Sequence, residues 1–135
     1  MKEQIKKHKV TDQICAWIFP NKKNYPGINI SLNSRESLLS LFQIMLKFQY
    51  SSVNEIQLNQ DQIPSWTINV GKVKTYSSII LKVNKKPDCQ SIISIKENQI
   101  SLNLKEQDLI KLQSAISNKI YDQSLIIGTT TLTFW

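Results

Sequence analysis

The chain has 135 residues, of which 41% are hydrophobic and 20% charged, with only three glycines and four prolines. This composition is typical of one globular domain and excludes collagenous, coiled-coil and broadly disordered proteins. Seventeen cationic against ten anionic residues give a net charge of +7, and all cations but Arg35 are lysines, which attract polyanions but read nucleic-acid sequence poorly.

The chain opens on a lysine-rich stretch, residues 1–10, that shows no hydrophobic periodicity and contains His8, the one histidine. We expect this stretch to be a loosely ordered leader, because chain ends are commonly poorly ordered, and His8 to be solvated and not a catalytic base. The apolar run 14–19 follows and predicts a strand. Cys15 in this run is expected to behave as a small buried hydrophobe.

One sequence unit occurs twice in the chain. The tetrapeptide Ile-Ser-Leu-Asn at 30–33 recurs at 100–103, an offset of 70 residues (100 minus 30), and the similarity continues in the same register to Ile56 and Ile126. Each copy has the pattern of a short strand, an amphipathic helix and a second strand. We therefore predict an internal repeat of a strand–helix–strand unit, approximately at residues 28–58 and 98–128.

A helix cap is predicted at the same place in both copies. Asn33 or Asn103 would cap the first free amides of the helix, while Glu36 or Glu106 reaches back in a variant of the capping box. After the first cap, apolar residues recur at i, i+3, i+4 and i+7 from Leu38, which predicts one buried helix face.

Two further strands, residues 66–74 and 78–83, are expected to pair between the copies. A bulge at Gly71 would turn Lys72 and Lys74 outward, beside the outward-facing Lys82 of the second strand. The pattern thus predicts a lysine cluster with one aromatic residue at the turn, made of Lys72, Lys74, Lys82, Lys85, Lys86 and Tyr76. This cluster is either a patch that binds acidic partners or a charged edge that protects a strand from aggregation.

The rest of the chain predicts two hairpins. Residues 91–95 would pair with the second copy through the tight Glu97–Asn98 turn, and the chain would end in a hairpin around residues 128–131. Trp135 at its end either closes the sheet or anchors an interface. Together the elements predict a single α+β domain over residues 1–135, with a mainly antiparallel sheet of about seven to nine strands and two helices on one face.

Few residues offer catalytic or metal-binding chemistry. Cys15 and Cys89 are isolated in the sequence, and the acids Glu36, Glu106 and Asp108 fall in predicted first turns of helices, where they favour the helix dipole. The sequence contains no phosphate-binding or metal-binding motif. We predict a non-enzyme with no catalytic residue, metal or cofactor.

Isolated cysteines favour a reducing compartment. The sequence contains neither the apolar region of a signal peptide nor an apolar run of the ~20 residues that span a bilayer. We expect a cytoplasmic protein without a membrane partner.

The second copy and the terminal hairpin carry a family resemblance. The stretch that runs from Ile100-Ser101-Leu102 through Leu109, Leu112 and Ile116 to Leu132-Thr133-Phe134-Trp135 resembles small bacterial immunity proteins of polymorphic-toxin and contact-dependent growth inhibition systems. The resemblance covers mainly the last 40 or so residues and rests on the pattern of elements. It implies a small cytoplasmic non-enzyme that binds one cognate toxin domain and occludes its active site.

This sequence departs from that family in one respect, because immunity proteins to nuclease toxins are often acidic and this chain is basic. The resemblance therefore implies a toxin domain with an acidic face, which the lysine cluster would meet, with Tyr76 and Trp135 as aromatic anchors.

Two other interpretations stay open. The chain could be a non-specific nucleic-acid-binding module that uses the lysine-rich strand face, with Tyr76 stacked on bases and binding that weakens steeply with salt. It could also be an enzyme that draws His8 or a carboxylate pair into a cleft. The partner, the oligomeric state and the strand order are left open by the sequence.

Overall fold

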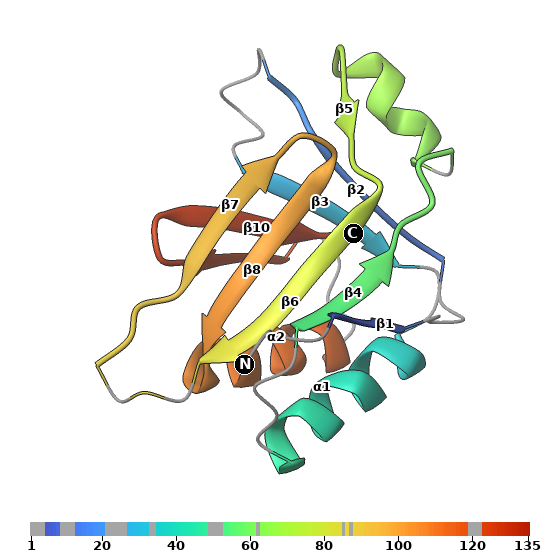
Figure 1. Cartoon of the computed structure of the whole chain (residues 1–135). Helices are drawn as coiled ribbons and strands as arrows, with labels where there is room; N and C mark the ends of the chain where they lie inside the picture. The colour runs from blue at the N-terminus through green and yellow to red at the C-terminus, as the bar shows by residue number, and fades with distance from the viewer. Residues whose placement is uncertain are drawn as a thin grey trace.

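The computed structural model describes residues 5–8, 13–20, 27–32, 35–48, 53–61, 63–84, 86, 88–118 and 123–135. This part of the chain is an α+β fold with two α-helices and two mixed sheets (Figure 1). The elements in chain order are β1 (Ile5–His8), β2 (Ile14–Ile18), β3 (Ile28–Leu32), α1 (Glu36–Phe48), β4 (Val53–Gln57), the 3₁₀ helix η1 (Ser65–Asn69), β5 (Lys74–Thr75), β6 (Ser78–Asn84), β7 (Ile92–Lys96), β8 (Gln99–Lys105), α2 (Glu106–Ser117), β9 (Gln123–Ile127) and β10 (Thr130–Phe134).

The strands form two five-stranded sheets, where the sequence predicted one. Sheet A has the order β1-β4-β6-β8-β7 and sheet B the order β5-β2-β3-β10-β9. Each helix leads from one sheet to the other, because α1 links β3 of sheet B to β4 of sheet A, and α2 links β8 of sheet A to β9 of sheet B. Alternation along a strand fixes which side chains share a face but not which strands pair, so it could not separate the sheets.

The predicted α+β class and the two helices are confirmed, but the prediction of one sheet is wrong, because the described strands form two mixed sheets. Antiparallel pairs are in the majority, as predicted, with five of the eight described pairs. Parallel pairs occur in both sheets: β1 with β4 and β6 with β8 in sheet A, and β3 with β10 in sheet B. The two strands of each parallel pair are separated by a long stretch of chain, because parallel neighbours cannot be joined by a tight turn. Strand β7 lies between β6 and β8 in the sequence, and α1 lies between the strands of the other two pairs.

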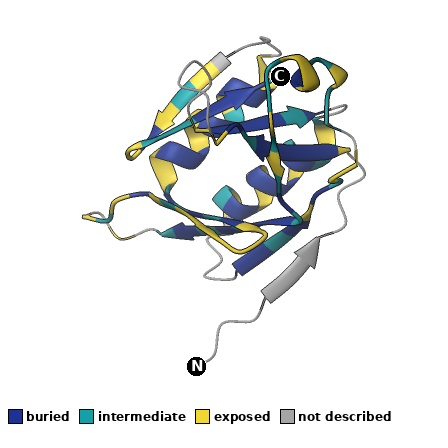
Figure 2. Ribbon diagram, turned by 90° about the horizontal axis from the view of Figure 1, so that it is seen from above, coloured by how far each residue is buried: buried dark blue, intermediate teal, exposed yellow. Residues whose placement is uncertain are grey.

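Both sheets and both helices enclose one apolar core (Figure 2). The stripe predicted on α1 is buried there, with Leu38, Leu41, Phe42 and Met45 all less than a tenth exposed. The space left between the apolar side chains of the two sheets and the two helices is a cavity of only about 20 Å³. The apolar side chains of the two sheets and the two helices are therefore closely packed around this cavity.

The predicted hairpins are confirmed. β7 pairs antiparallel with β8 across Glu97 and Asn98, and Glu97 takes the positive φ of 56° that such tight turns require. β9 and β10 pair in the same way across Gly128.

The predicted cap of the second helix is wrong. Asn103 lies inside β8, which continues to Lys105 because Lys105 still pairs with Asn84 of β6. The residue at the N-cap is Lys105, and no side-chain hydrogen bond caps the helix from that position. The corresponding Asn33 of the first copy lies outside the described residues.

The leader also differs from the prediction where it is described. Residues 5–8 form β1, a parallel strand beside β4, with Ile5 opposite Val53 and His8 opposite Ile56. Pairing with an exposed strand edge orders this backbone, although its sequence has no strand-like alternation. The other residues of the predicted leader lie outside the described part of the chain.

Candidate protein-binding face

The four described lysines of the predicted cluster do not lie together. Lys74 lies in β5 at the edge of sheet B, and Lys72 lies just before it, whereas Lys82 lies in β6 of sheet A. Lys86 is exposed in the connection after β6, and Lys85 lies outside the described residues. The prediction of a single lysine face is therefore wrong, although Lys82 does turn away from the core as expected, between buried Leu81 and Val83 neighbours.

The lysines separate because residues 66–74 are not a strand. Thr67 closes a tight turn on Pro64, since its amide and its hydroxyl both donate to the Pro64 carbonyl, at 3.1 and 2.8 Å. This turn starts η1, and only Lys74 and Thr75 then form a strand. That strand pairs with β2 of sheet B and not with β6, so no bulge at Gly71 aligns the two lysine rows.

Tyr76 is not available to stack on a ligand. The link from β5 to β6 passes from sheet B to sheet A, and it carries Tyr76 into the shared core, where the side chain is 0% exposed. Burial raises the pKa of its phenol above the ordinary value. The Lys74 ammonium lies 5.6 Å from the ring centroid, within cation–π range.

Trp135 packs against its own chain. Its ring centroid lies 4.7 Å from that of Trp66, and its indole NH donates to the Asn29 side-chain oxygen at 3.0 Å. Trp66 also packs edge-on against the fully buried Trp17, at 6.0 Å. Of the two roles predicted for Trp135, these contacts favour closing the sheet.

These aromatic residues belong to a second apolar cluster on the outward side of sheet B. Its buried members are Cys15, Trp17 and Phe19 of β2 and the residue after it, and its partly buried members are Ile63, Trp66, Val70, Val73 and Trp135. The segment between β4 and β6, which contains η1, therefore covers β2 on the outward side of sheet B, whereas Ile126 of β9 on that side is 68% exposed.

No segment of the described chain covers the outward side of sheet A in this way. Figure 1 shows its outward side turned towards the viewer, with sheet B and both helices behind it. We define the outer face of sheet A by the side chains that alternate away from the buried ones on β4, β6, β7 and β8. They are Glu55, Gln57, Ile80, Lys82, Asn84, Ile92, Ser94, Lys96, Gln99, Ser101, Asn103 and Lys105.

Cross-strand pairing sets the order of groups on this face. Lys82 lies opposite Asn103, which in turn lies opposite Ile92 at the edge. In the next row towards the β7–β8 turn, Ile80 lies opposite Ser101. The outer face thus carries three lysines against one glutamate, has isoleucines between them, and contains no aromatic side chain among its described residues.

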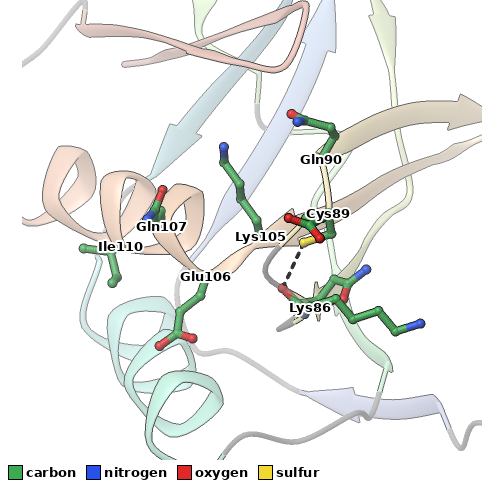
Figure 3. A pocket seen from close by; sticks show the side chains of 9 residues that line it. Lys86, Cys89, Gln90, Lys105, Glu106, Gln107 and Ile110 are labelled. Atoms are coloured by element: carbon green, nitrogen blue, oxygen red, sulfur yellow. Dashed lines mark hydrogen bonds between the residues drawn. The ribbon is translucent and has the colours of Figure 1, made fainter.

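A hollow of about 530 Å³ adjoins one end of this face, where β6 and β8 end and α2 begins (Figure 3). Its described lining is Asn84, Lys86, Asp88, Cys89, Gln90, Lys105, Glu106, Gln107 and Ile110. Two lysines balance two acids in that set, so the hollow has no net charge that would select an ionic ligand. The thiol of Cys89 donates to the carbonyl of Asn84 at 3.5 Å.

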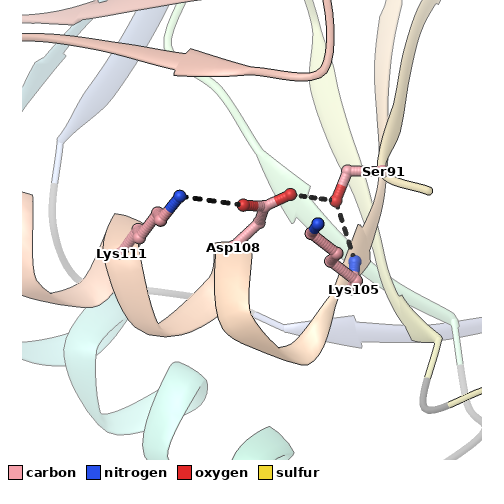
Figure 4. Close-up of polar contacts among 4 residues, drawn as sticks. All are labelled: Ser91, Lys105, Asp108 and Lys111. Carbon is pink, nitrogen blue, oxygen red and sulfur yellow. Dashed lines mark hydrogen bonds and ion pairs between the residues drawn. The ribbon is translucent and has the colours of Figure 1, made fainter. Parts of the chain in front are cut away.

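A buried polar network behind the hollow ties α2 to the start of β7 (Figure 4). The Ser91 hydroxyl donates to the carboxylate of Asp108, which is only 4% exposed, and accepts a hydrogen bond from the Lys105 amide at 2.9 Å. The Lys111 ammonium lies 3.9 Å from the other carboxylate oxygen. Ser91 therefore bridges the amide of Lys105, the N-cap residue, and the carboxylate of Asp108 in the first turn of α2.

The groups with catalytic potential are dispersed. Burial raises the pKa of the Cys15 thiol, which keeps it protonated and unreactive near neutral pH. Among the described residues, no three histidine, cysteine or acidic side chains gather where they could hold a metal ion. The side chain of His8 lies outside the described part of the structure.

No helix in the described part of the chain is both long and apolar enough to cross a membrane. Comparison of the sequence with protein-family models and with curated proteins gave no match, so the surfaces of the molecule itself carry the functional argument.

Proposed function

We propose that this protein is a non-enzymatic, protein-binding inhibitor of the immunity type, which docks the outer face of sheet A onto an acidic surface of a toxin domain. One observation carries the proposal: no described segment covers a four-stranded face with three lysines and one glutamate, whereas the η1 segment covers β2 on the corresponding side of sheet B. The proposal includes a cytoplasmic location, which suits two cysteines, Cys15 and Cys89, that form no disulfide.

The outer face has the properties that steer and hold a protein partner. Adjacent strands lie about 5 Å apart, so the face from β4 to β7 is about 15 Å wide before its side chains are counted. Lysines spread across it accelerate association with an acidic surface, whereas Ile80 and Ile92 supply apolar area for the docked state. A rigid sheet loses little conformational entropy on binding.

Nucleic acid is the less favoured partner. Proteins that bind single strands stack bases on exposed aromatic side chains, but Tyr76 is buried and the described outer face has no aromatic residue. What supports the nucleic-acid alternative is therefore positive charge alone.

We also propose that the two strand–helix–strand segments are copies of one unit. α1 begins 70 residues before α2 (106 minus 36), and β4 begins 70 residues before β9 (123 minus 53). The strand orders of the two sheets agree with such a repeat, in which β2, β3, β4 and β6 correspond to β7, β8, β9 and β10. When each strand is exchanged for its counterpart, the order β4-β6-β8-β7 of sheet A becomes β9-β10-β3-β2. This is the order of sheet B without β5. An experimental structure in which β3 and β4 fail to superpose on β8 and β9, with α1 laid on α2, would contradict this proposal.

The experiment that tests the function begins with a pull-down by the tagged full chain from its native lysate, in low and in moderate salt. A single stoichiometric protein that remains bound in moderate salt is the expected result, and its association rate with the purified chain is then measured. Eluate dominated by nucleic acid and lost as salt rises would overturn the proposal.

Charge reversal then tests the face. The double variant Lys82→Glu/Lys96→Glu should slow association by about tenfold or more, because it reverses two charges on the docking surface. The matched control, Lys72→Glu/Lys74→Glu, changes the net charge equally but lies on and beside β5 of sheet B. Equal effects of the two variants would mean that net charge, and not the outer face of sheet A, governs binding.

A further inference from the structure

β7 is an open edge of sheet A. Among the described strands it pairs only with β8, and its sequence, Ile-Ile-Ser-Ile-Lys, favours strand pairing while carrying a single charge. Ile92 is 60% exposed and Ile95 43% exposed along it. Natural sheets usually protect such an edge with charge, proline or a covering segment.

The edges built from the first half of the chain do have covers. β1 pairs with β4 at the other edge of sheet A, and β5 pairs with β2 at one edge of sheet B. The edges built from the second half, β7 and β9, have no covering strand among the described residues.

The main-chain N–H and C=O groups of successive residues in β7 point alternately to β8 and to the open edge. In a two-residue hairpin the closing pair, here Lys96 and Gln99, exchanges both main-chain hydrogen bonds, and every second pair along the hairpin does the same. The N–H and C=O groups of Ser94 and Ile92 therefore also point to β8. Those of Ile93 and Ile95 point to the open edge.

This arrangement is self-complementary. We propose that a second copy of this chain docks on β7, with the two β7 strands antiparallel about a twofold axis at Ser94. Ile93 of each copy then lies opposite Ile95 of the other, and these are the residues whose main-chain groups are directed outward, so they form hydrogen-bonded pairs on both sides of the axis. Ser94 lies opposite Ser94, and Ile92 lies opposite Lys96, so no like charges meet directly.

The distribution of charge supports a second copy at this edge. Residues 87–135 contain four lysines and five acids, which leaves thirteen cations and five acids (17 minus 4, 10 minus 5) in residues 1–86. When two copies meet through β7, the near-neutral residues 87–135 of each copy lie at the contact. The strongly basic residues 1–86 of the two copies then repel each other less, because they lie farther apart. Pairing also covers part of the exposed surface of Ile95 on each copy, which favours association.

The dimer would join the two copies of sheet A into one continuous sheet, and two outer faces would lie side by side. This inference stands on the edge of β7 and does not depend on the proposed function, since a homodimer forms with or without a toxin partner.

Sedimentation velocity of the full chain over a dilution series tests the dimer. A species of about twice 15.6 kDa is expected at high concentration. Ser94→Lys places two ammonium groups at the twofold axis and should raise the dissociation constant about tenfold or more, whereas the exposed position of Ser94 leaves the monomer folded, as a circular dichroism melt will show. Mixing Ser94→Lys with Ser94→Glu should restore a heterodimer.

The matched control is Ser124→Lys, which makes the same change at an exposed serine on the other open edge, β9. It should leave the dimer intact. A chain that stays monomeric at every concentration would overturn the inference. So would a dimer that Ser124→Lys dissociates and Ser94→Lys does not, or one that the lysine and glutamate variants fail to reconstitute.

Discussion

The outward sides of the two sheets have opposite characters, although both sheets use five strands and share one core. On sheet B, β2 directs Cys15 and Trp17 outward, and the chain buries them under residues from the η1 segment. On sheet A, the outward positions of β8 are Gln99, Ser101 and Asn103, and none of them is fully buried.

The difference follows from two connections. β4 and β6 are joined by residues 58–77, which are long enough to cross to sheet B and cover it, whereas β9 and β10 are joined by a tight turn. A long connection needs apolar residues on the sheet beneath it, and an open face needs polar ones. The apolar outward side of β2 thus goes with the long connection between β4 and β6. The polar outward side of sheet A goes with the short turn between β9 and β10.

The largest predicted effect tests the covered side. Trp17→Ala removes a fully buried ring that packs against Phe19 and Trp66, so the free energy of unfolding should fall by about 3 to 5 kcal/mol, measured by urea denaturation. If this variant does not fold, Trp17→Phe, which keeps a ring against Trp66, gives a smaller measurable loss.

The control lies on the open side. Gln99→Ala alters an exposed residue of the outer face of sheet A and should change the free energy of unfolding by less than about 0.5 kcal/mol. A loss comparable with that of Trp17→Ala would mean that the outer face is covered in solution, and the comparison of the two sides would then be wrong.

A second prediction concerns the rim of the open face, where one polar contact is structural. Asp108→Ala leaves the buried Ser91 hydroxyl without its acceptor and should cost about 2 kcal/mol of the free energy of unfolding. Glu106→Ala changes an exposed acid in the same helical turn and should cost much less. Equal losses would indicate that the helix dipole, and not the contact with Ser91, explains the role of Asp108.

Local pattern predicted much of the fold. The alternation of Ile79, Leu81 and Val83 with polar neighbours predicted β6, and the i, i+3, i+4 spacing predicted the buried side of α1, because a side chain's face depends only on its own element. The same alternation in Trp66, Ile68 and Val70 falsely predicted a strand over residues 66–74. There, the hydrogen bonds of Thr67 to Pro64 close a 3₁₀ turn that apolar spacing does not encode.

The candidate site was predicted less well, because it depends on pairing between distant segments. Lys82 was placed on an outward face correctly, but Lys96 and Lys105 join it only through the pairing of β6, β8 and β7. The contact of Ser91 with Asp108 joins residues 17 positions apart, so the sequence pattern around α2 does not reveal it. The spacing of Asn103 and Glu106 is that of an ordinary capping box, and it therefore predicted the wrong cap. Burial of Tyr76 likewise depends on β5 and β6 belonging to different sheets.

The smallest predicted effect concerns Tyr76, the residue that passes between the two sheets. Its hydroxyl is buried and has no hydrogen-bond partner among the described residues, so Tyr76→Phe should leave the free energy of unfolding at neutral pH unchanged or raise it by up to about 1 kcal/mol. The pKa of this phenol is raised in the folded state, whereas in the unfolded chain it titrates near the ordinary value of 10.0. Above that pH the unfolded state binds fewer protons than the folded state, so this residue lowers stability as the pH rises. Unfolding at neutral pH and at about pH 11 should therefore show a smaller alkaline loss for Tyr76→Phe than for the wild type, and equal losses would mean that Tyr76 is solvated in the folded protein.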